Sequence, residues 1–141
     1  MENKINTGRV LLGGIVGGIA MMIIGALIHG GMLGDYYLEL QNKGIIKPME
    51  EAGTEWMHHV YLVLTGIPLA LLYVFSRKHF GPGPKAAFIV GLLVGLIGVA
   101  GGGFAMYCFY NVGQAVPFWT GVDVLVESIV CTLIAGALYK D

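Results

Sequence analysis

The last apolar run of the chain reads VPFWTGVDVLVESIVCTLIAGALY, from Val116 to Tyr139. It is longer than the ~20 residues that an α-helix needs to cross the hydrocarbon core of a bilayer. Asp123 and Glu127 lie inside it, four residues apart and therefore on one helix face, and the run has no basic residue. An acid at this depth is costly, so it is usually buried in protein, paired or protonated. The run therefore predicts a spanning helix with an intramembrane polar site at Asp123 and Glu127.

Three further segments have the same apolar character and indicate a four-helix transmembrane bundle. The chain has 141 residues, of which 56% are hydrophobic and 12% charged, whereas soluble domains carry roughly 25% charge. The charged residues are clustered, which leaves long uncharged stretches. We expect an all-α single domain over residues 1–141, with spans at roughly 10–33, 56–76, 86–110 and 116–139.

The positions of lysine and arginine predict the orientation of the spans, because loops rich in these residues stay in the cytoplasm. Six of the eight basic residues lie at the two termini and between the second and third spans: Lys4, Arg9, Arg77, Lys78, Lys85 and Lys140. The first connection, residues 34–55, has only Lys43 and Lys47 against five acidic residues. We therefore expect both the N and the C terminus in the cytoplasm and the first connection outside.

The first connection is too long for a simple turn and predicts short helices on the membrane surface. Residues 35–42 alternate acidic with aromatic and aliphatic side chains. A second helix-like stretch over residues 49–56 follows Pro48 and has acids in its first turn, as the helix dipole favours. We expect one or two short interfacial helical segments between the first and second spans.

Small residues recur at helical spacing in three of the spans and predict close helix packing, because they let backbones approach one another. The residues expected at helix contacts are Gly13, Gly17, Gly98, Gly102, Ser128, Thr132 and Gly136. Four short helices need fewer close-approach faces than these residues provide. The surplus favours an external partner, either other membrane-protein subunits or a second copy of the chain.

The short third connection makes the third and fourth spans antiparallel neighbours and predicts their register. With the hairpin centred near Gly113, Gly103 lies level with Asp123. The same register puts Val99 level with Glu127. We therefore expect Glu127 to be buried in protein and to donate a hydrogen bond to a backbone carbonyl of the third span.

Three histidines lie at the predicted outer ends of the first and second spans: His29, His58 and His59. Two imidazoles at one depth on facing helices can ligate a haem iron or the magnesium of a chlorophyll-type pigment. The chain has no metal-spaced pair such as HxxxH, so we expect no metal site and no resident cofactor. A haem or chlorophyll-type pigment held by His29 with His58 or His59 is the alternative.

Three landmarks carry a resemblance to known sequences. They are Arg9-Val10-Leu11 at the first span, Phe80-Gly81-Pro82-Gly83-Pro84-Lys85 after the second, and Glu127 followed by Thr132-Leu133-Ile134-Ala135-Gly136-Ala137-Leu138-Tyr139. In these the chain resembles an uncharacterised bacterial family of small four-span integral membrane proteins. The resemblance implies the fold, a place in the bacterial inner (cytoplasmic) membrane, and an acid at Glu127. Asp123 has no counterpart in the family, which has no established activity.

Several function classes are disfavoured by the sequence. A net charge of −1 without a basic stripe argues against nucleic acid. The chain lacks a nucleophile–base pair, a P-loop, a dinucleotide fingerprint and a zinc-protease motif, so we expect no catalytic residue and no enzyme.

The leading interpretation is therefore an accessory or structural subunit of a larger membrane complex or homo-oligomer, in contact with the lipid bilayer. One alternative is a small proton- or cation-coupled transporter or channel that uses Asp123 and Glu127. The other is a tetrapyrrole- or metal-holding electron-transfer or pigment subunit that uses the histidines.

Overall fold

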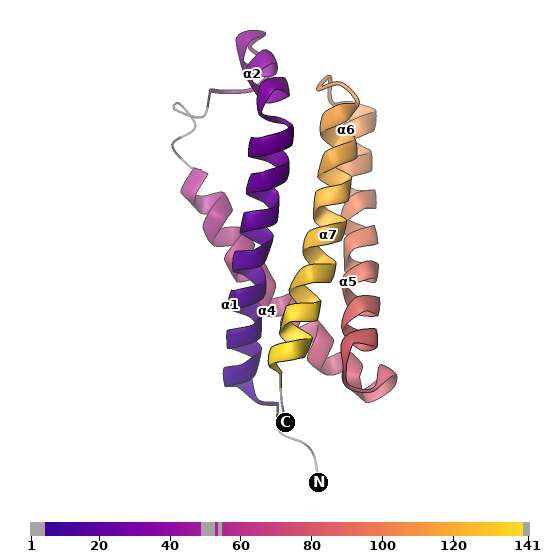
Figure 1. Ribbon diagram of the computed structural model, residues 1–141. Helices are drawn as coiled ribbons and strands as arrows, with labels where there is room; N and C mark the ends of the chain where they lie inside the picture. Colours follow the sequence, from indigo (N-terminus) through magenta and orange to yellow (C-terminus); the bar gives the residue numbers. More distant parts are fainter. Residues whose placement is uncertain (1–4, 49–52, 54, 140–141) are drawn as a thin grey trace.

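Four membrane-length helical segments form the molecule. The computed structural model describes residues 5–48, 53 and 55–139, and this part of the chain is helical, without β-strands. The segments long and apolar enough to cross a membrane are Thr7–Met32, Trp56–Phe80, Pro84–Phe109 and Ala115–Leu138. They run alternately up and down, with both termini at one end (Figure 1). The predicted four-helix transmembrane bundle is confirmed, and the largest difference in a span boundary is the end of the second span, at Phe80 instead of residue 76.

The first span consists of two kinds of helix. α1 (Thr7–Gly25) begins at Asn6, whose side-chain oxygen accepts a hydrogen bond of 3.2 Å from the backbone N–H of Arg9. It continues directly into a π-helix, η1 (Ala26–Met32), and then into the short helix α2 (Gly34–Asn42). In α2, Leu40 is buried and most other residues are exposed, which fits a short helix lying on the surface of the bundle. The second expected interfacial stretch, residues 49–56, lies mostly outside the described residues.

The third span changes helix type in the same way. α5 (Pro84–Gly98) starts with a proline at its first position, where no intrahelical N–H is required. It passes into a π-helix, η2 (Val99–Gly103), and then into α6 (Phe104–Phe109). Both π-helices lie in the half of the bundle that is away from the termini (Figure 1). We call this part the α2 half and the opposite part the terminal half.

The remaining two spans are continuous α-helices. α4 (Glu55–Phe80) carries Pro68 and is tilted against the other spans, and α7 (Ala115–Leu138) packs against α1, α4 and α5 (Figure 1). In the terminal half these helices enclose an apolar core of Val10, Ala70, Tyr73, Val74, Ala86, Ala87, Ala135 and Tyr139. The two ends of the chain are tied there, because the backbone N–H of Asn6 donates to the hydroxyl of Tyr139 at 3.1 Å.

Glycines make the closest helix contacts of the terminal half. A Cβ atom added to Gly13 would lie 3.0 Å from Cα of Ala135, and one added to Gly17 would lie 2.6 Å from Sγ of Cys131. α5 meets α7 in the same way, since a Cβ on Gly91 would lie 2.5 Å from Cα of Ile129. Gly136 faces Ala87 and Tyr73. These contacts depend on hydrogen taking the place of a side chain.

Gly102 differs from the sequence prediction. A Cβ there would meet nothing within 4 Å, whereas Gly98 faces Val124 and Gly103 faces Gly121. Gly103 was expected to lie level with Asp123 but lies level with Gly121, so the predicted register is wrong by two residues. The π-helix η2 accounts for the position of Gly102, because i→i+5 bonding widens the turn and redirects the residues within it.

Candidate functional site: a buried carboxylate pair

Asp123 and Glu127 lie on one face of α7 and are both buried, with 5% and 4% of their surface exposed. They face the first span at Gly25. A Cβ atom added to Gly25 would lie 3.0 Å from Oε1 of Glu127 and 3.8 Å from Oδ2 of Asp123. The two acids are therefore packed inside protein against a stretch of backbone that has no side chain.

The third span is not the neighbour of these acids, although the sequence suggested it. The face of α7 that meets the third span carries Gly121 and Leu125, which lie against Gly103 and Gly95. Each acid is two residues further along, and two residues turn an α-helix by about 200°. Glu127 therefore points to the opposite side of α7 and meets the first span.

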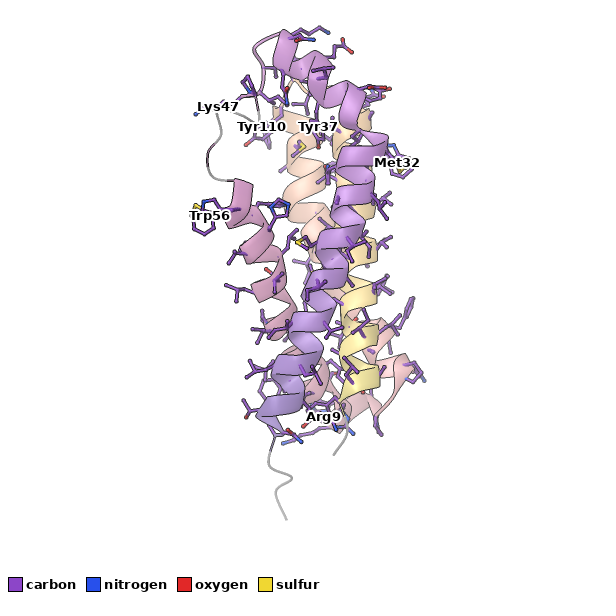
Figure 2. All side chains as sticks on the ribbon, turned by 60° about the vertical axis from the view of Figure 1, so that its left-hand side comes forward. Arg9, Met32, Tyr37, Lys47, Trp56 and Tyr110 are labelled. Atoms are coloured by element: carbon purple, nitrogen blue, oxygen red, sulfur yellow. The ribbon has the colours of Figure 1, made fainter. Side chains whose placement is uncertain are left out.

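His29 joins the carboxylate pair to the short helix α2. Its Nε2 lies 3.0 Å from Oδ2 of Asp123, and its Nδ1 lies 2.7 Å from the hydroxyl of Tyr37. The histidine belongs to the π-helix η1, and Tyr37 lies at the α2 end of the bundle (Figure 2). The side chain of His29 is 31% exposed, whereas that of Asp123 is 8% exposed. A continuous hydrogen-bonded series thus runs from a half-buried tyrosine to a buried acid.

The direction of these hydrogen bonds depends on the tautomer of His29, and Tyr37 takes part in them as a neutral hydroxyl. Burial, and then the nearby negative charge of Asp123, raise the pKa of the Tyr37 hydroxyl from its ordinary value of about 10, while a hydrogen bond with Thr120 opposes this. Tyr37 is therefore a neutral hydroxyl at physiological pH, able to donate or to accept. In the tautomer of His29 that carries its proton on Nε2, Tyr37 donates to Nδ1 and the Nε2–H group donates to Oδ2 of Asp123.

Two carboxylate oxygens of the site remain without a partner. Within the described part of the chain, Oδ1 of Asp123 and Oε1 of Glu127 are buried and make no hydrogen bond. Buried polar atoms in native proteins are nearly always satisfied, and an unsatisfied one is costly. A proton or another cation on the pair would supply what these two oxygens lack.

The donor set does not favour a metal ion. Among residues 5–48, 53 and 55–139, no group of three or more His, Cys, Asp or Glu side chains is arranged to hold one. Both ring nitrogens of His29 are engaged, so a metal or a tetrapyrrole would have to displace Tyr37 or Asp123. His58 and His59 lie at the exposed start of α4, with their rings edge-to-face at 6.0 Å. A cofactor on the histidines stays an untested prediction.

The hydroxyl groups that follow Glu127 along α7 do not extend the series. Ser128 donates to the carbonyl of Val124 at 2.8 Å, and Thr132 donates to the carbonyls of Ser128 and Ile129 at 2.9 and 3.0 Å. Both side chains are buried, and Thr132 is fully buried. Both hydroxyls therefore donate to backbone carbonyls of α7 and not to the carboxylates, which face the first span.

The sequence placed Asp123 and Glu127 on one helix face and marked His29 separately, but it connected neither His29 nor Tyr37 to the acids. His29 and Asp123 are 94 residues apart, so no local pattern links them. Tyr37 follows His29 by eight residues. Because a π-helix ends and a new helix begins between them, this spacing does not predict that the two side chains meet. The neighbouring Gly25, Gly30 and Gly31 were the available signal for irregular backbone.

No family model, no curated protein and no solved structure matches this chain. The resemblance to an uncharacterised bacterial membrane family therefore stays a prediction.

Proposed function

We propose that this membrane protein binds and releases a proton at Asp123 and Glu127, as a small proton-coupled transporter or channel. One observation carries the proposal. Two buried oxygens of the pair lack a partner, while a third oxygen is hydrogen-bonded through His29 to Tyr37 at the α2 end. Chains of Asp, Glu and His inside membrane proteins are typical of proton relays.

A proton fits this site better than a metal ion. It needs one acceptor oxygen and a hydrogen-bonded route, and the series Tyr37–His29–Asp123 offers both. A divalent ion would need several ligands free to turn toward it, whereas His29 is already held at both nitrogens.

The test is proton flux in proteoliposomes under an imposed pH gradient. Glu127→Gln keeps the size and the hydrogen-bonding capacity of the side chain but cannot titrate, so it should assemble normally and abolish the flux. Val126→Ala, on the exposed side of the same helix, is the matched control and should conduct like the wild type. Wild-type flux in both Glu127→Gln and Asp123→Asn would refute the proposal.

A second candidate, a subunit of a larger assembly or homo-oligomer, is favoured by the start of α4. All six residues from Trp56 to Tyr61 are exposed, although a helix in a bundle normally buries one face. Trp56 points away from the other helices (Figure 2). Native mass spectrometry of protein extracted in mild detergent should then show a bound subunit or a second copy. A monomer that conducts protons would argue against this candidate.

A further inference from the structure

We infer that the carboxylate pair exchanges its proton with the α2 end of the bundle only, through Tyr37 and His29, and is closed toward the terminal half. This inference rests on the proposed function and adds a direction to it. The bundle in this state is a half-channel. The orientation expected from the basic residues would make it open to the outside.

The open side is the hydrogen-bonded series itself. The proton of the Tyr37 hydroxyl passes to Nδ1 of His29 while its oxygen takes a proton from water. The imidazolium then gives its Nε2 proton to Oδ2 of Asp123, across 3.0 Å. One proton enters and one reaches the carboxylate, and rotation of the ring restores the starting tautomer. Tyr37 begins the route in α2, beyond the end of the first span, and is partly exposed there.

The closed side is the glycine packing between Glu127 and the termini. Immediately past Glu127, α7 meets α1 at Gly17 and Gly13, where an added Cβ would lie 2.6 Å from Cys131 and 3.0 Å from Ala135. Contacts this close leave no space for a water molecule between the helices. Thr132 and Cys131 are fully buried, and the Thr132 hydroxyl is committed to backbone carbonyls. No series of hydrogen bonds therefore continues toward the terminal half in the described part of the chain.

The titratable surroundings of the pair agree with this direction. From η1 the neighbour is His29, from α2 it is Tyr37, and along α7 it is Cys131. From α4, apolar Leu62 and Leu69 pack with Met21 and Cys131. The third span lies against the opposite face of α7. Of these titratable neighbours, His29 and Tyr37 lie on the α2 side of the pair, and Cys131 is a buried thiol.

The chain contains its own reporter of orientation. Cys108 in α6 is exposed at the α2 end, and Cys131 is buried. A membrane-impermeant maleimide added to proteoliposomes should therefore label Cys108 only in molecules whose α2 end faces the external medium. Two preparations with different labelled fractions then provide the sidedness measurement.

The experiment is a rapid drop of external pH, followed by infrared detection of the protonated carboxyl band. Glu127→Gln and Asp123→Asn assign that band. The amplitude of the fast phase should equal the Cys108-labelled fraction in both preparations. Tyr37→Phe should slow the fast phase by roughly tenfold or more without changing its final amplitude, because positioned proton-transfer groups accelerate by such factors. Tyr36→Phe, the exposed neighbouring tyrosine, is the matched control and should match the wild type.

Three results would overturn the inference. The first is a fast-phase amplitude that equals the fraction of molecules not labelled at Cys108. The second is a fast phase of equal amplitude in both orientations. The third is a fast-phase rate in Tyr37→Phe that equals the rate in Tyr36→Phe. Each of these leaves proton binding intact and rejects only its direction. A band that neither Glu127→Gln nor Asp123→Asn alters would instead reject the proposed function, and the inference with it.

Discussion

The two halves of this bundle both contain many glycines and apolar residues, but they differ in packing and in polar content. The terminal half is regular α-helix around an apolar core, with Ala86 and Ala87 fully buried. The α2 half contains two π-helices, the partly buried His29 and a pair of buried acids. Close packing and the polar site are thus separated along the long axis of the bundle (Figure 1). A well-packed half can stabilise the fold while the other half carries unsatisfied polar groups.

The glycines show the difference most directly. In the terminal half a missing side chain brings two helices into backbone contact, as at Gly91. In the α2 half it makes room for a functional group, as at Gly25, or leaves open surface, as at Gly30 and Gly102. Substituting a glycine should therefore destabilise the fold in the terminal half and disturb the carboxylate site in the α2 half.

The largest effect is expected for Gly91→Ala in the terminal half. The new methyl group would lie 2.5 Å from Cα of Ile129 and 2.7 Å from the carbonyl oxygen of Ser128, and backbone cannot move aside locally. We expect a loss of about 1–3 kcal/mol in the free energy of unfolding, measured by denaturant titration in detergent. Gly102→Ala in the same span meets nothing within 4 Å and should unfold like the wild type. Equal losses in both variants would contradict the division into halves.

A smaller effect on stability but a clear effect on function is expected for Gly25→Ala. Its methyl group would lie 3.0 Å from Oε1 of Glu127, so the carboxylate has to shift by a few tenths of an ångström. We expect proton flux to fall while the free energy of unfolding changes by less than about 1 kcal/mol. Gly30→Ala adds a methyl group into open space in η1 and should leave both the proton flux and the free energy of unfolding unchanged. A stability loss as large as that of Gly91→Ala would show that the α2 half is packed like the terminal half.

The smallest effect concerns the alkaline limit of the α2 half. The pKa of Tyr37 is raised in the folded protein, mainly by burial, so the folded state keeps this proton at a pH where the unfolded chain loses it. The resulting stability is fully present below the ordinary tyrosine pKa of about 10 and is lost as pH rises through the higher folded value. Wild-type stability should therefore fall more steeply above pH about 10 than that of Tyr37→Phe. Parallel profiles in thermal unfolding would show that Tyr37 is not buried against Asp123.

Much of the architecture follows from the amino-acid sequence alone. The number of spans and their limits follow from the length of uncharged apolar runs, because a bilayer requires a minimum helix length and excludes charge. The same rule marks Asp123 and Glu127 as exceptional. Their four-residue spacing is enough to place them on one face, because an α-helix repeats every 3.6 residues.

Only the tertiary structure decided which helix the two acids face and which side chain forms a hydrogen bond with Asp123. The rotation of α7 depends on how Gly121, Leu125 and Cys131 fit against two neighbouring helices at once, a balance of contacts that hydropathy does not describe. The π-helices are equally hidden, because one extra residue in a turn changes every later direction without changing composition. His29 reaches Asp123, 94 residues away, because η1 and α7 pack side by side at that depth, and only the folded chain brings them together.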